Sequence, residues 1–276
     1  MSMVVTDLDG TLLDARARLG PANRRALERL GERGVLRVVA TGRSLHSADR
    51  VLDAHFPIDY LVFSSGAGVL HWPTRDLLVA HGMRAADADG VLERLLDARL
   101  AFMVHRAVPD NHFFFYHWEA GRAEDSNPDF HRRCERYREF AEPLSPRGIV
   151  DMEVSQFLAV EAPGDESLYD ALAAELAHLN VVLTTSPLDH RSRWIEIFPP
   201  AASKSNASEW LRRRHRVAHR DVLAIGNDFN DRDLLEWAEH AFVVANAPPS
   251  LRSRYPVVAS HDDQGFAEAV AARGLV

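Results

Sequence analysis

The sequence predicts an α/β protein with a Rossmann-like parallel sheet core, helices on both faces of that sheet, and an inserted α+β cap domain. Three observations predict this fold. Short apolar runs alternate with helical stretches early in the chain, the same alternation returns near its end, and the middle follows another pattern. The predicted core is discontinuous, at residues 1–81 and 191–276, and the predicted cap covers residues 82–190.

The first part of the chain alternates strands and helices through short connections. Apolar runs at residues 4–5, 35–40 and 60–63 are predicted strands, and residues 22–33 and 44–54 are predicted helices. This order is typical of parallel βαβ units. Because ligands bind beyond the carboxyl ends of the strands in such sheets, the loops that follow the three runs are expected to lie close together.

The middle of the chain contains two helical stretches and several isolated strands, which is typical of a small inserted α+β domain. The expected helices cover residues 87–97 and 166–179, and the expected strands include residues 112–118 and 153–160. The alternation then resumes, with strands expected at 194–198, 222–225 and 242–244 and helices expected from Ser203, at 232–239 and at 263–272.

Composition limits the class of protein. The chain has 276 residues and a net charge of −8, which argues against nucleic acid as the main partner. There is no run of 18 apolar residues and no basic segment followed by an apolar one at the N-terminus, so neither a membrane span nor a signal peptide is expected. The single cysteine, Cys134, cannot form an internal disulfide, and we expect a cytoplasmic protein.

Lysine is almost absent from the chain. Of the 32 lysine and arginine residues, Lys204 is the only lysine. The lysine ammonium is a compact point charge that the planar guanidinium of arginine does not reproduce. Lys204 therefore indicates a position with a special requirement, against the alternative that one surface lysine survived by chance.

Two aspartates, Asp7 and Asp9, end the first apolar run within the sequence Asp-Leu-Asp-Gly-Thr at residues 7–11. Residues two apart in a strand project to one side, and two carboxylates at the end of a buried strand are costly unless a cation neutralises them. Because carboxylates suit Mg²⁺, this pair is a candidate metal site. The alternative is a pair of exposed aspartates in a turn.

A second acidic loop, at residues 227–231, follows another apolar run. It offers the carboxylates of Asp228 and Asp231 and the amides of Asn227 and Asn230. Two acidic loops at strand ends converge if they share a site. The alternative is that Asn230 or Asp231 caps a helix, and both interpretations can hold together.

Three further residues suit a phosphate group. Thr41 and Gly42 supply a hydroxyl and an unobstructed backbone N–H. Lys204 adds the compact cation that a phosphoryl group and an attacking carboxylate need. These residues indicate a phosphate site beside the candidate metal site.

Together, these segments resemble the haloacid dehalogenase superfamily. Residues 7–11 match its first motif, residues 41–43 its second, Lys204 its third and residues 226–231 its fourth, in order and on both sides of the predicted insertion. The insertion between the second and third motifs resembles the cap of the Cof-type subfamily. The resemblance implies a magnesium-dependent phosphatase that forms an aspartyl-phosphate.

The resemblance also implies roles for individual residues. Asp7 would attack phosphorus, and Asp9 would protonate the leaving oxygen and later take a proton from the hydrolytic water. The phosphate would be held by Thr41, Gly42, Lys204 and Asn230. The Mg²⁺ ion would be held by Asp7, the backbone carbonyl of Asp9 and the fourth motif, where the candidates are Asn227, Asp228 and Asp231.

Asn227 departs from the family pattern. It stands where the fourth motif, Gly-Asp-x-x-Asn-Asp, usually has its first aspartate. An asparagine can offer an oxygen to Mg²⁺ but no negative charge, so we expect weaker metal binding than in relatives. Asp228 or Asp231 could supply the missing negative charge, and the sequence leaves open which residue is the third ligand of the Mg²⁺ ion.

The cap is expected to select the substrate, a small phosphorylated metabolite of the sugar or polyol phosphate class. Polar and aromatic side chains suit such a ligand, and the candidates are Arg43 of the second motif and, in the cap, His105, Arg106, Asn111, His112, Tyr116 and His117. An alternating strand would turn half of the side chains at residues 112–118 into solvent or into the cap's own core. The sequence has no pair of histidines at a spacing typical of a zinc site, so zinc is not expected.

Two other functions remain open at this stage. A phosphomutase shares the motifs but returns the phosphoryl group to its substrate. A metabolite-binding or regulatory protein would keep the site but turn over slowly, and Asn227 is the one feature that favours it. The intact Asp7, Asp9 and Lys204 argue against that function, and the oligomeric state stays open.

Overall fold

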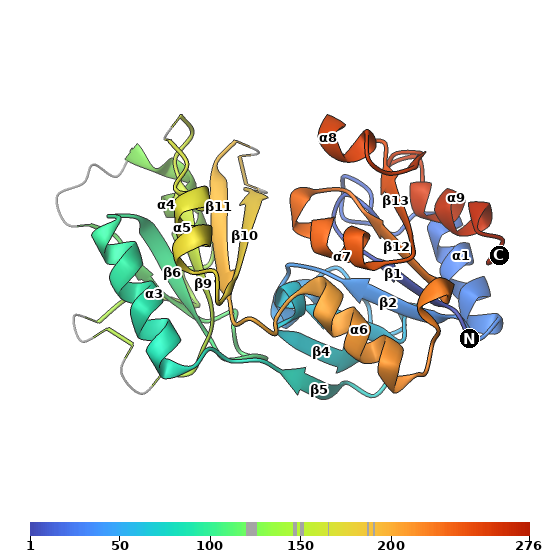
Figure 1. The fold of residues 1–276 in the computed structure, drawn as a ribbon, viewed down its shortest axis with the longest axis horizontal. Coiled ribbons are helices and arrows are strands. Elements are labelled where there is room, and N and C mark those ends of the chain that lie inside the picture. Colours follow the sequence, from blue (N-terminus) through green and yellow to red (C-terminus); the bar gives the residue numbers. More distant parts are fainter. Residues whose placement is uncertain (120–125, 146–147, 150–151, 165, 187, 190) are drawn as a thin grey trace. The chain divides into compact units, whose positions relative to one another are not determined.

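The computed structural model of the chain describes residues 1–119, 126–145, 148–149, 152–164, 166–186, 188–189 and 191–276. Its contacts separate two compact units, Met1–Val79 with Ser203–Val276, and Ala80–Ala202 (Figure 1). We call the first unit the core and the second the cap. Among the described helices, none combines the length and the apolar composition that a bilayer span requires.

The core is built on an eight-stranded sheet in the order β14-β13-β12-β1-β2-β3-β4-β5. Its strands are β1 (Met3–Thr6), β2 (Leu36–Ala40), β3 (Tyr60–Phe63), β4 (Gly68–His71), β5 (Asp76–Ala80), β12 (Val222–Gly226), β13 (His240–Val244) and β14 (Val257–Val258). Neighbouring strands are parallel from β14 to β3, and β4 pairs with β3 in the antiparallel direction. The predicted parallel sheet is therefore present, but the whole sheet is mixed.

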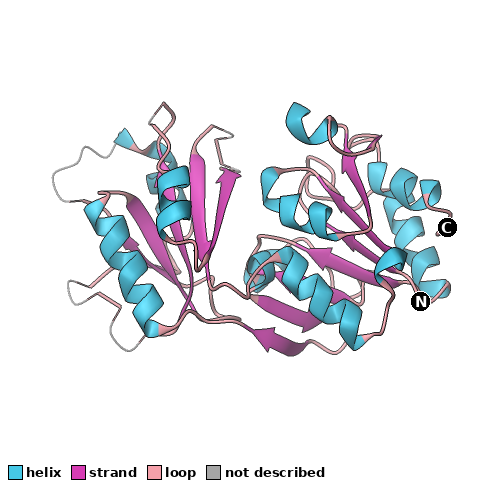
Figure 2. Ribbon diagram, in the orientation of Figure 1, coloured by secondary structure: helices cyan, strands magenta, loops and turns pink. Residues whose placement is uncertain are grey.

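Helices cover both faces of the core sheet (Figure 2). Alternate residues of β1, Met3 and Val5, pack in one apolar cluster with residues of α6 and α7. Helices α1 and α9 contact each other and the sheet on the other side. The core helices are α1 (Pro21–Glu32), α2 (Leu45–Ala48), α6 (Lys204–Arg214), α7 (Arg232–Trp237), α8 (Pro249–Arg252) and α9 (Gly265–Ala272).

The cap has its own six-stranded sheet in the order β10-β11-β9-β6-β7-β8. Its strands are β6 (Ala101–Arg106), β7 (Phe114–His117), β8 (Ala141–Pro143), β9 (Val154–Glu161), β10 (Asn180–Thr185) and β11 (Arg193–Phe198). Two apolar clusters lie on this sheet, one with α3 (Ala85–Asp97) and α5 (Tyr169–Glu175), the other with α4 (Pro128–Arg136). The predicted α+β insertion is confirmed.

One strand was expected in the wrong sheet. The apolar run at residues 194–198 does form a strand, β11, but it pairs with β9 and β10 of the cap and not with the core sheet. A buried antiparallel strand and a buried parallel strand both appear in sequence as a short apolar run. The core unit therefore resumes at Ser203, after Pro199 and Pro200 have ended the strand.

Two helices are also shorter than expected. The helix predicted at 44–54 is limited to α2, and the helix predicted at 166–179 is limited to α5. Beyond α5, Leu176 and Leu179 are buried in the cap's apolar cluster without being helical. After α5, the apolar residues of the sequence therefore mark buried positions, but the predicted helix is longer than the observed one.

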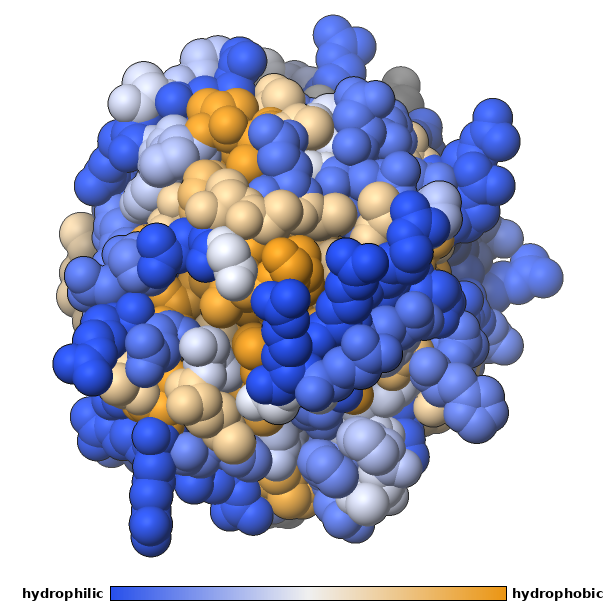
Figure 3. Space-filling view, turned by 90° about the vertical axis from the view of Figure 1, so that its right-hand side faces the viewer, coloured by the Kyte–Doolittle hydropathy of each residue, from blue (hydrophilic) through white to orange (hydrophobic). Residues whose placement is uncertain are grey.

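The surface mixes charged and apolar side chains. On the face shown in Figure 3, hydrophilic residues surround a smaller group of apolar ones. Among the residues that the structure describes, the exposed large apolar side chains come from separate parts of both units, and they are Met1, Leu77, Leu96, Phe229 and Val257. Isolated exposed apolar side chains of this kind are ordinary.

Candidate active site

The carboxyl ends of three core strands lie side by side, because β1 pairs in parallel with both β2 and β12. Asp7 directly follows β1, Thr41 directly follows β2, and the acidic loop at 227–231 directly follows β12. Lys204 is the first residue of α6, which Ser203 caps. The sheet brings all four segments that the sequence singled out to one edge.

Lys204 lies between two carboxylates. Its Nζ donates to Asp7 Oδ1 at 2.7 Å and to Asp231 Oδ1 at 2.5 Å. All three side chains are buried. Burial lowers the pKa of Lys204, but the charges of Asp231 and Asp7 outweigh burial and raise that pKa above its usual value. A compact, permanently charged ammonium fits this position, which accounts for the single lysine.

Asp7 is incompletely neutralised, because one lysine serves two buried carboxylates. Burial and then the charge of Asp231 raise the pKa of Asp7 to about 7, although Lys204 lowers it. A buried carboxylate in this state is stabilised by a further positive charge. The uncompensated negative charge of the site therefore favours a cation beside Asp7.

Asp231 organises the acidic loop. While Oδ1 binds Lys204, Oδ2 accepts from the backbone N–H groups of Asn227 at 2.8 Å and Asp228 at 3.2 Å. A Cβ at Gly226 would lie 2.7 Å from the Asp231 side chain, so glycine is required for this close approach. Both oxygens of Asp231 are engaged within the protein.

Asp9, in contrast to these buried carboxylates, is exposed. Its carboxylate accepts two hydrogen bonds of 2.6 Å from Arg43, in a side-on pair at the protein surface. Arg43 also donates to the hydroxyl and the carbonyl of Ser47, at 3.1 and 3.2 Å. The guanidinium is thus anchored in the second-motif segment, and it holds Asp9 to that segment.

The side chain of Asn227 faces the first motif. One of its two amide atoms lies 3.1 Å from Asp7 Oδ2, 3.1 Å from the Asp9 carbonyl oxygen and 3.0 Å from Thr11 Oγ1. Among the described residues, no three His, Cys, Asp or Glu side chains are grouped as a metal site would need. Any cation here must therefore use amide and carbonyl oxygens besides carboxylates.

The phosphate candidates are partly arranged for that role. Thr41 is buried, and its hydroxyl accepts the Arg43 backbone N–H at 3.1 Å, which leaves the hydroxyl proton available. A Cβ on Gly42 would meet only Ser65 Oγ, at 3.6 Å, so space alone does not demand glycine. Asn230 is half-buried in the short turn that begins the fourth motif's helix.

Ser65 is a residue that the sequence analysis missed. It follows β3 at the same edge of the sheet, has φ of 50°, and carries a buried hydroxyl without a partner among the described residues. The next residue, Gly66, packs so closely that a Cβ would lie 2.2 Å from the Ser203 carbonyl oxygen. The Ser-Ser-Gly sequence after the third apolar run was the available signal.

The cap candidates do not converge on one place. His105 is buried, and its Nδ1 lies 2.7 Å from the Asn111 carbonyl oxygen. Arg106 lies over the rings of Phe113 and Phe115, and His117 stacks on Phe102. Tyr116 packs against Phe130, and His112 packs against Phe113 and Phe140. Strand alternation distributes them over both faces, as we expected.

A buried polar row beside His105 escaped the sequence analysis. His105 stands opposite Gln156 in the cap sheet, and Gln156 Nε2 donates to Glu196 at 3.1 Å. Burial, followed by the charge of Arg133, lowers the pKa of His105 to about 3, so the imidazole is neutral. These residues lie in strands that are mostly apolar, and no sequence motif marks them.

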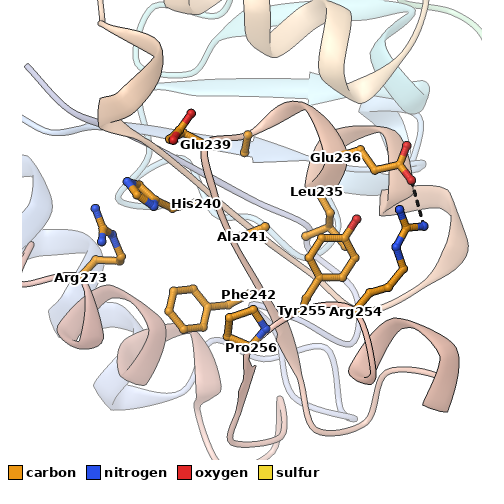
Figure 4. Close-up of a pocket in the computed structure, with 11 residues that line it drawn as sticks. Leu235, Glu236, Glu239, His240, Ala241, Phe242, Arg254, Tyr255, Pro256 and Arg273 are labelled. Atoms are coloured by element: carbon orange, nitrogen blue, oxygen red, sulfur yellow. Dashed lines mark ion pairs between the residues drawn. The ribbon is translucent and has the colours of Figure 1, made fainter.

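A hollow of about 660 Å³ elsewhere on the core contains none of the candidate residues (Figure 4). It lies around the start of β13, with Glu236, Arg254 and Arg273 at its margin. Glu236 and Arg254 form an ion pair of 3.2 Å at one side of it (Figure 4). Because β13 begins there, the hollow is at the opposite end of the parallel strands from Asp7.

Comparison with known proteins decides the family. The family model of haloacid dehalogenase-like hydrolases matches residues 4–270. The chain belongs to this family. It is 24% identical to the 5-amino-6-(5-phospho-D-ribitylamino)uracil phosphatase YwtE of Bacillus subtilis, over 97% of this chain and 96% of that protein. It is 29% identical to the HMP-PP phosphatase of Escherichia coli O6:H1, over 91% of this chain and 86% of that protein.

Solved structures share the whole fold. BT1666 from Bacteroides thetaiotaomicron matches with a TM-score of 0.77 and 20% identity, over 100% of this chain and 96% of that chain. The subclass IIB sugar phosphatase BT4131 also matches with a TM-score of 0.77, at 14% identity and full coverage of both chains. The chain is thus a metal-dependent phosphatase of the haloacid dehalogenase superfamily, of the Cof type, and it shares the fold of the subclass IIB enzyme BT4131. The two curated relatives named above are phosphatases of small phosphorylated metabolites.

Proposed function

We propose that this phosphatase hydrolyses small phosphate monoesters through an aspartyl-phosphate on Asp7, with Mg²⁺ as its metal. The observation that carries the proposal is the buried Lys204 bridge, which fixes Asp7 Oδ1 and leaves Oδ2 at the candidate cation position. A nucleophilic carboxylate needs this combination of fixed orientation and neighbouring positive charge.

The residues present fit Mg²⁺. Asp7 Oδ2, the Asp9 carbonyl oxygen and the Asn227 amide lie together, with two separations of 3.1 Å. Neighbouring ligands of an octahedral Mg²⁺ are about 2.9 Å apart, since each lies 2.0–2.1 Å from the metal. Asp231, whose two oxygens are engaged, is proposed to position the loop rather than to bind metal. Asp228 uses Oδ1 to cap the Phe229 N–H.

The metal, when bound, supplies charge neutralisation and alignment of the phosphoryl group. One carboxylate oxygen of Asp7 forms a bond to phosphorus as the bond from phosphorus to the ester oxygen breaks, and Asp9 gives its proton to the ester oxygen. Water then attacks the aspartyl-phosphate, Asp9 takes a proton from it, and the Asp7 carboxylate leaves. Arg43 must release Asp9 for either proton transfer, because its donors occupy both Asp9 oxygens.

The phosphoryl oxygens are proposed to be held by Thr41, Gly42, Lys204 and Asn230. Thr41 offers a free hydroxyl proton, and Lys204 offers its charge from the buried side. Ser65 adds a second buried hydroxyl at the same edge of the sheet. Donors fixed before the substrate arrives are those that stabilise a transferring phosphoryl group most effectively.

The proposed substrate is a sugar or polyol phosphate. YwtE is named for a phosphorylated ribityl compound, and BT4131 is described as a sugar phosphatase. The polar row of His105, Gln156 and Glu196 is rich in acceptors, which suits hydroxyl donors. We further propose that core and cap act as separate domains and that the protein works in the cytoplasm.

The test is phosphate release from a panel of sugar, polyol and nucleotide phosphates, with Mg²⁺ and with a chelator. Asp7→Asn should reduce release at least about 10⁴-fold, because the nucleophile is lost. Asp89→Asn, the same change at an exposed residue of the cap, should leave release unchanged. Release that survives Asp7→Asn would refute the proposed mechanism.

A further inference from the structure

Asn227 occupies the centre of the candidate metal site without carrying charge. One atom of its amide lies 3.1 Å from both Asp7 Oδ2 and the Asp9 carbonyl oxygen. As a nitrogen, this atom donates one N–H to each of two oxygens that would otherwise repel one another. As an oxygen, it would complete a group of three oxygens, which is stable only around a cation.

Thr11 is compatible with either orientation of the amide. Its hydroxyl lies 3.0 Å from the same amide atom, and a hydroxyl can both accept and donate. When the amide nitrogen occupies this place, the hydroxyl can only share one of its two hydrogens with a neighbouring oxygen, and when the amide oxygen occupies it, the hydroxyl donates to that oxygen. The far amide atom lies beside Gly10, where a Cβ would approach it to 2.7 Å, so the glycine leaves room for both orientations.

We propose that the Asn227 amide stands in for the cation in the metal-free protein and becomes a metal ligand by turning through half a rotation. Its nitrogen holds Asp7 and Asp9 together when no metal is present, and its oxygen faces the metal when one is bound. This inference rests on the proposed metal site but concerns a state in which no metal and no substrate are present.

This rotation of the amide explains why residue 227 is an asparagine, where the family pattern has an aspartate. An aspartate at this position would lie against Asp7 Oδ2 and the Asp9 carbonyl oxygen with no hydrogen to offer. The metal-free site would then be destabilised by repulsion, and the loaded site would be stabilised by an added charge. Asn227 reverses both effects, so the metal-free protein is stable and metal binding is weaker.

The first test compares thermal melts of the wild type, Asn227→Asp and the exposed control Asn206→Asp, each at pH 8 with EDTA and with saturating Mg²⁺. With EDTA, Asn227→Asp should melt lower than the wild type by roughly 5 °C or more, and Asn206→Asp should not. Saturating Mg²⁺ should raise the melting temperature of Asn227→Asp more than that of the wild type. Equal melting of Asn227→Asp and wild type in EDTA would overturn the proposal.

The second test follows the wild-type protein and needs a variant only to assign one signal, for which Asn227→Gln suffices, so it holds even if Asn227→Asp fails to fold. The side-chain amide pair of Asn227 is identified in ¹⁵N-labelled protein, through its absence from the spectrum of Asn227→Gln or Asn227→Asp. Titration with Mg²⁺ should shift that pair and speed its exchange with solvent, while the pair of Asn206 stays in place. An Asn227 pair that stays fixed while other site signals report bound Mg²⁺ would overturn the half-turn. Failure of the catalytic proposal is separate, since it appears as phosphate release that survives Asp7→Asn.

Discussion

The candidate site of the core and the surroundings of Asp129 in the cap bury carboxylates in opposite ways. In the core, Asp7 and Asp231 share the ammonium of Lys204. In the cap, Asp129 is equally buried but is bound by neutral donors, Ser186 Oγ at 2.9 Å and Trp194 Nε1 at 2.7 Å. At the core site charge is matched with charge, and at Asp129 a charge is surrounded by dipoles, although elsewhere in the cap the buried Glu161 does pair with Arg193 at 3.1 Å.

The difference separates what a site needs from what a scaffold needs. A buried group of unlike charges is strongly coupled, since removal of one member leaves the others uncompensated. A carboxylate held by neutral donors loses less when any single donor or its own charge is removed. Variants around Lys204 should therefore have large and interdependent effects, and variants around Asp129 should have smaller and nearly additive ones.

The largest effect is expected for Lys204→Met. It leaves Asp7 and Asp231 buried without a cation, which should lower the free energy of unfolding by about 3–5 kcal/mol and abolish phosphate release. The double variant Lys204→Met/Asp231→Asn should recover part of the stability but none of the activity. Urea denaturation and phosphate release measure the two properties. A double variant no more stable than Lys204→Met would show that the carboxylates are not coupled through the lysine.

The same contrast explains what the sequence could predict. The core site was predictable because parallel strands place their carboxyl ends at one edge, so Asp7, Thr41 and the loop at 227–231 had to meet there. The single lysine in an arginine-rich chain marked Lys204 before its partners were known. Even so, the sequence could not assign Asp231, because its two engaged oxygens depend on the path of the loop.

The cap was predictable in composition but not in detail. The expected strand at 153–160 is present as β9. Nothing in its sequence, however, indicates that Gln156 belongs to a buried polar row with His105 and Glu196. Register between strands decides which side chains become neighbours, and register comes from tertiary packing. For the same reason, β11 could not be assigned to its sheet from an apolar run alone.

The second largest effect concerns pH and His105. The pKa of this imidazole is about 3 in the folded cap against an ordinary value of 6.5, because burial and then Arg133 disfavour its charge. Between these values the unfolded chain binds the extra proton, so the free energy of unfolding falls as the pH is lowered below 6.5. Through His105 alone, the loss should reach about 2 kcal/mol at pH 5.

His105→Gln keeps a donor for the Asn111 carbonyl and removes this titration. Its stability relative to the wild type should therefore improve by about 2 kcal/mol between pH 8 and pH 5, as measured by urea denaturation at each pH. His55→Gln, at an exposed histidine of the core, should leave the pH dependence as it is. Parallel pH profiles for the wild type and His105→Gln would show that His105 is protonated in the folded cap.

The smallest effect is expected for Asp129→Asn in the cap. The amide oxygen can still accept from Trp194 Nε1, and the Ser186 hydroxyl, which already accepts the Leu188 N–H, can also accept from the amide nitrogen. The extra strength of hydrogen bonds to a charged group is lost together with the bond that the Ser186 hydroxyl donates, and we expect a cost of about 1 kcal/mol. Thermal or urea denaturation beside the exposed control Asp89→Asn measures it. A cost of the size expected for Lys204→Met would mean that the carboxylate of Asp129 is paired with a cation after all, and the nearby Arg133 would be the group to test.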